Sequence, residues 1–253
     1  MIPQNYIDML GAKSVIRTLS EWATARGQEI GYDNVFDYSL GNPSVPCPEH
    51  FTRTMIRLLQ TEQPVTLHGY SPSLTIPSVR RAVADSLNRR FGMHYGPEHI
   101  FMTSGAAGAL AHALRCVCQP GQEVLVPVPF FPEYKPYIEG AGLVMRTIPP
   151  RVEDFQIDLE AMDAAINENT AAVLINTPNN PSGAVYTADT MRALADLLTA
   201  ASARIGRHIF LISDEPYREI LFGGQPIVYP AKFYADTLTC YSFSKSLSLP
   251  GER

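Results

Sequence analysis

Short apolar segments alternate with segments of helical character over residues 100–241, and this order limits the fold more than any other feature. We expect six strands, at residues 100–103, 123–128, 143–148, 171–175, 208–212 and 237–241. Strands that are separated by helices usually pair in parallel, with helices covering both faces of the sheet. The sequence therefore predicts an α/β fold with a mainly parallel sheet sandwiched by helices.

The residues before this region form a different pattern. Residues 14–30 are predicted to form an amphipathic helix, residues 35–40 a short strand, and residues 41–50 a proline-rich turn, GNPSVPCPEH. In residues 76–92, apolar side chains recur at the spacing of one helix face, at Val79, Ala82, Val83 and Leu87. We therefore expect an N-terminal arm, followed by a helix that leads into the sheet.

The charge balance excludes some classes of protein. The 253 residues include 20 Lys and Arg against 25 Asp and Glu, a net charge of −5, so a nucleic-acid surface is not expected. No apolar stretch reaches the ~20 residues of a membrane helix, and the N-terminus lacks the pattern of a signal peptide. We expect a cytoplasmic protein without a membrane segment. The four cysteines and six dispersed histidines predict no metal site.

Ligands of open parallel sheets bind beyond the carboxyl ends of the strands, so the residues that follow each strand are informative. Five of these segments carry unusual polar, glycine or aromatic residues: SGAAGAL (104–110), PFFPEY (129–134), NTPNNPSG (176–183), SDEPYREI (213–220) and SFSKSLSLPGER (242–253). Five strands thus deliver candidate binding residues to one edge of the sheet.

The segment SGAAGAL can present the backbone N–H groups of Ala106 and Ala107 at the start of a helix, where phosphate binds well. An ordinary helix start is the plain alternative for this segment taken alone. The chain has no GxGxxG and no GxxxxGK[ST] motif, which argues against a dinucleotide or a nucleoside triphosphate.

Two charged residues suggest chemistry at the same edge. Asp214 ends an apolar strand, where a carboxylate needs a partner, and Tyr217 follows it by three residues. Lys245 lies among small hydroxyl residues, and a desolvated lysine there would attack a carbonyl carbon. The alternatives are a structural aspartate and a solvated lysine. Together the features favour a ligand with a phosphate, a basic aromatic nitrogen and an aldehyde, and pyridoxal phosphate has all three.

The motifs NTPNNPSG, SDEPYREI and SFSKSLSLPGER closely resemble, in this order, those of the class I/II aminotransferases, which are fold-type I pyridoxal-phosphate enzymes. The resemblance, which is to aspartate-aminotransferase-like members, runs from the GNP turn to the last residue. It implies a seven-stranded-type sheet, an N-terminal arm and part of the small domain in residues 1–47, and the cofactor-binding large domain in residues 48–253. It also implies that the large domain is incomplete and that the small C-terminal domain, with its carboxylate-binding arginine, lies outside this sequence.

The resemblance assigns roles around the cofactor ring. It makes Lys245 the Schiff-base lysine and the base that moves the Cα proton of the substrate. Asp214 matches the partner of the pyridinium nitrogen, which keeps the ring able to accept electrons. Asn180 and Tyr217 match the pair that binds the phenolic oxygen of the ring, and Phe131 matches the aromatic residue that stacks on it.

The resemblance also assigns a phosphate cup and a substrate loop. Its cup consists of the turn at Gly105, Ala106 and Ala107 together with Ser242 and Arg253. Arginine suits this role because its planar fork can bind two phosphate oxygens.

Two residues near the N-terminal arm complete this set. Tyr70 resembles a tyrosine that reaches the phosphate of the neighbouring subunit, which implies a homodimer with shared active sites. Gly41 resembles the glycine of the loop that, with Asn180, binds the substrate carboxylate. A packed loop aromatic and a turn glycine are the structural alternatives for Tyr70 and Gly41.

The function implied by the resemblance is transfer of an amino group between an L-amino acid and a 2-oxo acid, with aspartate and 2-oxoglutarate as the favoured pair. The same residues would also serve a C–S β-lyase, because the choice of reaction depends on how substrate bonds lie relative to the ring. A non-catalytic pyridoxal-phosphate-binding regulatory domain is a third reading. Such regulators carry a basic DNA-binding domain, which we do not expect in this acidic chain.

Overall fold

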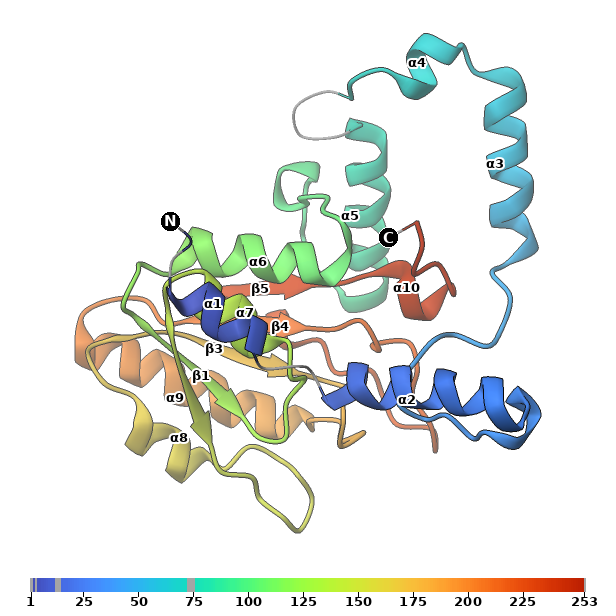
Figure 1. The fold of residues 1–253 in the computed structure, drawn as a ribbon. Helices are drawn as coiled ribbons and strands as arrows, with labels where there is room; N and C mark the ends of the chain where they lie inside the picture. The colour runs from blue at the N-terminus through green and yellow to red at the C-terminus, as the bar shows by residue number, and fades with distance from the viewer. Residues whose placement is uncertain (1, 3, 12–14, 72–75, 253) are drawn as a thin grey trace.

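The computed structural model describes residues 2, 4–11, 15–71 and 76–252, and its centre is a parallel sheet of five strands (Figure 1). The strand order is β2-β1-β3-β4-β5, and every pairing is parallel. The strands are β1 (Glu123–Pro127), β2 (Val144–Ile148), β3 (Thr170–Asn176), β4 (Phe210–Asp214) and β5 (Thr237–Cys240). The predicted α/β class and parallel sheet are confirmed.

Helices cover both faces of the sheet, as alternating strand residues show. On one face, Val173 and Ile175 of β3 belong to a buried cluster with residues of helices α8 (Leu159–Ala165) and α9 (Ala188–Ile205). On the other face, Ala172 and Leu174 pack in a cluster with residues of α6 (Gly105–Val117) and α7 (Tyr134–Gly140). Successive side chains of a strand point to opposite faces, so the apolar run of residues 171–175 in β3 is what a sheet covered on both sides requires.

The N-terminal part contains several helices that surround or project from this core. They are α1 (Gln4–Gly11), α2 (Val15–Ile30), η1 (Tyr32–Asn34), α3 (Glu49–Thr61), α4 (Pro64–His68) and α5 (Pro77–Phe91). The helix predicted in residues 76–92 is confirmed as α5, which ends at Gly92 in the left-handed conformation. Among the helices of the described ranges, none is both long and apolar enough to cross a membrane.

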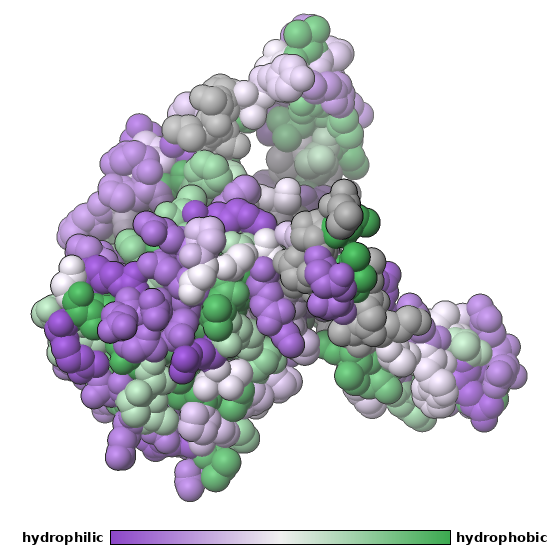
Figure 2. All heavy atoms as spheres, turned by 60° about the vertical axis from the view of Figure 1, so that its left-hand side comes forward, coloured by the Kyte–Doolittle hydropathy of each residue, from purple (hydrophilic) through white to green (hydrophobic). Residues whose placement is uncertain are grey.

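Helix α3 extends away from the sheet and buries none of its residues (Figure 1). Its apolar side chains Met55, Ile56 and Leu59 are 42%, 50% and 61% exposed. The space-filling view shows apolar side chains on the segments that project from the body of the molecule (Figure 2). Helix α3 is therefore amphipathic, but its apolar side chains are not buried against any described part of the chain.

Two of the strand predictions are wrong. Residues 35–40 are extended or bent, with Phe36 79% and Tyr38 91% exposed, and residues 100–103 follow the short helix η2 (Pro97–His99) without forming a strand. A strand needs a neighbour that accepts and donates its backbone hydrogen bonds. Within the described ranges neither segment has one, so five of the six strands expected in residues 100–241 form the sheet.

Candidate active site

The carboxyl ends of β3, β4 and β5 lie level at one edge of the sheet. Asn176 of β3 pairs with Asp214 of β4, and Asp214 pairs with Cys240 of β5. The side-chain amide of Asn176 donates a 2.8 Å hydrogen bond to the backbone carbonyl of Asp214. This register brings the segments that follow the three strands to one place, as the sequence predicted.

Asp214 is buried, and its two carboxyl oxygens have different surroundings. Oδ2 accepts a 2.6 Å hydrogen bond from the hydroxyl of Tyr134, whereas buried Oδ1 has no hydrogen-bond partner among the described residues. Burial raises the pKa of the Asp214 carboxyl to about 7, against the lowering effect of the Tyr134 hydrogen bond. A buried acceptor without a donor is costly, so Oδ1 is suited to bind an N–H group of a ligand.

Asn180 and Tyr217 meet at the same edge. The Asn180 side-chain amide donates to the Tyr217 hydroxyl over 3.5 Å, and its backbone N–H donates to Oδ1 of Asn176 over 2.6 Å. Burial, and then the nearby Asp214, raises the pKa of the Tyr217 hydroxyl. The structure therefore brings Asn180, Asp214 and Tyr217 together, as predicted.

Lys245 lies in the short helix α10 (Phe243–Ser246), which follows β5. The side chain of Ser242 caps this helix by accepting a 3.0 Å hydrogen bond from the backbone N–H of Ser244. The Lys245 Nζ donates a 2.5 Å hydrogen bond to the backbone carbonyl of Gly41. Two predicted site residues that are 204 positions apart are thus in direct contact.

The glycine turn before α6 has the shape expected of an anion-binding loop. Gly105 is buried with φ of +69°, a conformation that favours glycine, and helix α6 begins there with Ala106 and Ala107. Helix α6 lies beside β5, the strand that leads to Ser242 (Figure 1). Ser242 is itself buried. Arg253, the remaining predicted member of the phosphate cup, lies outside the described residues.

Sequence reasoning missed Tyr134, the partner of Asp214. The rings of Phe131 and Tyr134 meet edge to face, with centroids 5.8 Å apart, so residues 129–134 supply both the predicted aromatic residue and the hydrogen-bond donor to the carboxylate. Burial, followed by the charge of Asp214, raises the pKa of the Tyr134 hydroxyl well above its usual value, so this group stays a hydrogen-bond donor. Tyr134 is the last residue of PFFPEY, a segment predicted to lie at the binding edge, and its position there could have marked it as a candidate.

Tyr70 does not join these residues. Its side chain is fully exposed. Tyr70 follows α4, a helix that lies away from the sheet (Figure 1).

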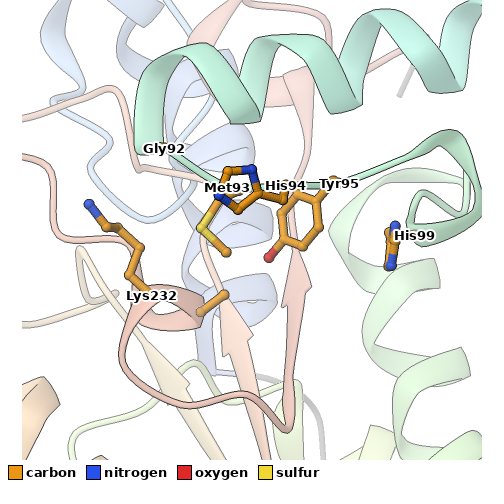
Figure 3. Close-up of a pocket in the computed structure, with 7 residues that line it drawn as sticks. Gly92, Met93, His94, Tyr95, His99 and Lys232 are labelled. Atoms are coloured by element: carbon orange, nitrogen blue, oxygen red, sulfur yellow. The ribbon is translucent and has the colours of Figure 1, made fainter.

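A hollow of about 430 Å³ lies at the turn after α5, away from the residues just described (Figure 3). Its lining residues are Gly92, Met93, His94, Tyr95, His99, Ala231 and Lys232. None of the predicted site residues lines it, and we assign no ligand to it.

The chain belongs to the family described as aminotransferase class I and II, whose model matches residues 33–253. Enzymes of this family depend on pyridoxal phosphate. The level ends of β3, β4 and β5 and the buried Asp214 therefore lie in a fold whose family binds this cofactor.

Three relatives illustrate the similarity. A crystal structure of an aminotransferase from Eubacterium rectale is 42% identical, with a TM-score of 0.95 over 100% of this chain and 64% of that one. A probable aspartate/prephenate aminotransferase from Aquifex aeolicus is 33% identical over 91% of this chain and 58% of its own length. An S-alkyl-thiohydroximate lyase from Arabidopsis thaliana is 35% identical over 83% of this chain and 45% of its own length. The chain thus spans less than two thirds of each of these relatives.

Proposed function

We propose that the protein containing this chain is a pyridoxal-phosphate-dependent aminotransferase that moves an amino group between an L-amino acid and a 2-oxo acid. The observation that carries the proposal is the buried Oδ1 of Asp214, which has no hydrogen-bond partner among the described residues and lies at the same edge as the helix of Lys245. Family membership and the names of the aminotransferase relatives support it.

The residues present fit the cofactor. Asp214 Oδ1 would accept a hydrogen bond from the ring nitrogen, and Asn180 with Tyr217 would bind the phenolic oxygen. Phe131 would lie against the ring. Gly105, Ala106, Ala107, Ser242 and Arg253 would hold the phosphate. When bound, pyridoxal phosphate supplies an aldehyde that condenses with amines and a ring that withdraws electrons from the reacting carbon.

The protein contributes charge and proton transfer. A cation on the ring nitrogen would lower the pKa of Asp214 from about 7, so that the carboxylate stays ionised and holds the nitrogen protonated. The Lys245 amine would then take the proton from the Cα atom of the substrate and return it to the C4′ carbon of the cofactor. In the absence of cofactor, the Gly41 carbonyl, 2.5 Å from Nζ, would orient the Lys245 amine.

The proposed substrate pair is aspartate and 2-oxoglutarate, and the name of the Aquifex aeolicus relative supports aspartate. Gly41 and Asn180 would contact the substrate carboxylate. We further propose that residues 1–47 form an arm with part of the small domain and residues 48–253 the cofactor-binding domain.

The active form is proposed to be a homodimer in which Tyr70 of one copy reaches the phosphate site of the other. The full exposure of Tyr70 and the unburied apolar side chains of α3 support this arrangement, because exposed apolar side chains that lie together are typical of a surface that contacts another protein.

The first test is borohydride trapping of the full-length protein after incubation with pyridoxal phosphate, followed by peptide mass spectrometry. We expect the reduced cofactor on Lys245 and its loss in Lys245→Ala. The matched control is Lys232→Ala, which removes an exposed lysine outside the site and should leave the label in place. A label on any other lysine, or none, would overturn the cofactor assignment.

The second test separates transamination from β-elimination. An amino-donor panel should yield glutamate from 2-oxoglutarate, fastest with aspartate. Release of pyruvate and ammonia from sulfur amino acids without amino transfer would show the lyase reaction of the second reading instead.

A further inference from the structure

A chain of hydrogen bonds joins the segment after β4 to the helix that carries Lys245. The Tyr241 hydroxyl donates a 2.9 Å hydrogen bond to Oε2 of Glu219 and lies 2.8 Å from Oγ of Ser246. Because the Tyr241 proton goes to the carboxylate, the Ser246 hydroxyl donates to the Tyr241 oxygen. Glu219 lies five positions after Asp214, and Ser246 directly follows Lys245, so these bonds connect the two halves of the site.

Arginine side chains hold the far end of this chain in place. Oε1 of Glu219 lies 2.9 Å from Arg90 of α5 and 3.5 Å from Nε of Arg218. Arg218 is buried, forms a 3.1 Å ion pair with buried Glu215, and lies 4.3 Å from the centre of the Tyr241 ring. Both oxygens of Glu219 are therefore occupied, and the carboxylate cannot turn without breaking several contacts.

Helix α10 needs such an anchor because it is very short. It has four residues, far below the length at which a helix is stable by itself. Ser242 caps its first turn, and the buried Leu249 follows its end. Ser246 is the last residue of the helix, and its hydrogen bond to Tyr241 connects this end, through the Tyr241 hydroxyl and Glu219, to the segment after β4.

We propose that Glu219, Tyr241 and Ser246 are positioning residues that fix α10, and with it the Lys245 amine, relative to Asp214 and Tyr217. The inference rests on the proposed function, since it gives these residues a purpose only if Lys245 carries the cofactor. Their hydroxyl and carboxylate groups act through the helix and do not touch the reacting atoms.

The decisive variants are Tyr241→Phe and Ser246→Ala. Phenylalanine keeps the ring contacts of Tyr241 with Arg218 and Phe243, whose ring centroid is 5.4 Å away, and removes only the hydroxyl. The matched control is Tyr234→Phe, because the Tyr234 hydroxyl donates a 2.7 Å hydrogen bond to the carbonyl of Ile209 in the core cluster on the other face of the sheet. All three variants lose one hydroxyl, but only the first two loosen α10.

The first readout uses full-length protein without cofactor. Amide hydrogen exchange of residues 243–249 should speed up about fivefold in Tyr241→Phe and in Ser246→Ala, which corresponds to the loss of one hydrogen bond. The double variant should be no faster than either single one, because both changes break the same chain of bonds. Ser246→Thr, which keeps a hydroxyl, should restore slow exchange. Exchange equal to that of Tyr234→Phe would overturn the proposal.

The second readout is the rate at which Lys245 acquires the borohydride-stable cofactor label. This rate should fall about fivefold in Tyr241→Phe and stay unchanged in Tyr234→Phe, even if both lose similar thermal stability. An unchanged rate in Tyr241→Phe, with the label still on Lys245, would refute the positioning role alone. Absence of the label from Lys245 in the unaltered protein would instead refute the proposed function.

Discussion

The hydroxyl of Tyr134 supports the carboxylate of Asp214 from 80 residues away, through a 2.6 Å hydrogen bond to Oδ2. This bond occupies one oxygen and leaves buried Oδ1 directed at no donor of the described residues. A carboxylate held in this way is both fixed in direction and ready for one further cationic partner.

Removal of that support should be measurable in Tyr134→Phe. The hydrogen bond lowers the pKa of Asp214, so its loss should raise that pKa above about 7 and favour the neutral acid, which binds a protonated ring nitrogen poorly. We expect pyridoxal phosphate to dissociate about tenfold more readily at pH 7, the scale of one hydrogen bond to a charged group. Fluorescence titration measures this change.

A matched control for this prediction is Tyr186→Phe, which removes the hydroxyl of another buried tyrosine in the core cluster beside α9. Equal affinity in Tyr134→Phe and Tyr186→Phe would contradict the supporting role of Tyr134.

The cofactor-free protein should lose stability as pH rises from about 4 to about 7. The folded-state pKa of Asp214 is about 7, above its ordinary value of 3.8, so the folded state binds the proton more tightly than the unfolded state. The resulting stability is complete below about pH 4 and lost as pH rises through 7. In Asp214→Asn, the change in the free energy of unfolding between pH 4 and pH 7 should be smaller by roughly 2–4 kcal/mol.

Urea unfolding from pH 4 to 8 measures the free energy of unfolding of the unaltered protein and of Asp214→Asn, and the difference between the two curves gives the contribution of Asp214. Glu215, whose burial also raises its pKa to about 7, should keep part of the slope in Asp214→Asn. The exposed Asp196 provides the control Asp196→Asn, which should leave the slope unchanged. Parallel curves for Asp214→Asn and the unaltered protein would contradict the assigned burial.

Gly105→Ala should destabilise the protein by about 1–2 kcal/mol, because a φ of +69° strains any residue with a Cβ atom. Its neighbour in the same helix, Gly108, is the control, since a Cβ there would meet the Thr103 side chain at an ordinary 3.5 Å. Gly108→Ala should be neutral or stabilising by about 0.5–1 kcal/mol. Thermal unfolding compares the two, and equal effects would refute the requirement for glycine at position 105.

Tyr70→Ala should separate stability from cofactor binding. The side chain is fully exposed, so its removal should change the unfolding free energy of the monomer by less than about 0.5 kcal/mol. If Tyr70 reaches the phosphate site of a second copy, affinity for pyridoxal phosphate should still fall in the dimer. Mixing Tyr70→Ala with Lys245→Ala protein should restore one complete site per heterodimer, and failure to do so would argue against shared sites.

Much of the sheet and of the candidate site could be predicted from local sequence. The five strands of the sheet combine β-branched or apolar runs with turn residues at their ends, and the parallel register then brings Asn180, Asp214 and Tyr217 to one edge without further information. Periodicity and strand order are enough for these features.

The wrong and the missed predictions all concern residues whose partners lie far away in the sequence. Residues 100–103 have strand-like composition, but strand formation requires a neighbour that composition does not reveal. Tyr134 and the chain from Glu219 to Ser246 were missed because each acts through a hydrogen bond to a residue far along the sequence. Such pairings follow from tertiary packing and leave no periodic signal.

The hydrogen bond between Lys245 Nζ and the Gly41 carbonyl closes a loop of about two hundred residues. During synthesis on the ribosome, Gly41 is made long before Lys245, so the two residues cannot meet while the strands of the sheet are still being translated. Contacts of such long sequence separation form slowly, because loop closure has an entropic cost. The contact between Gly41 and Lys245 can therefore form only after the segment that follows β5 has been translated.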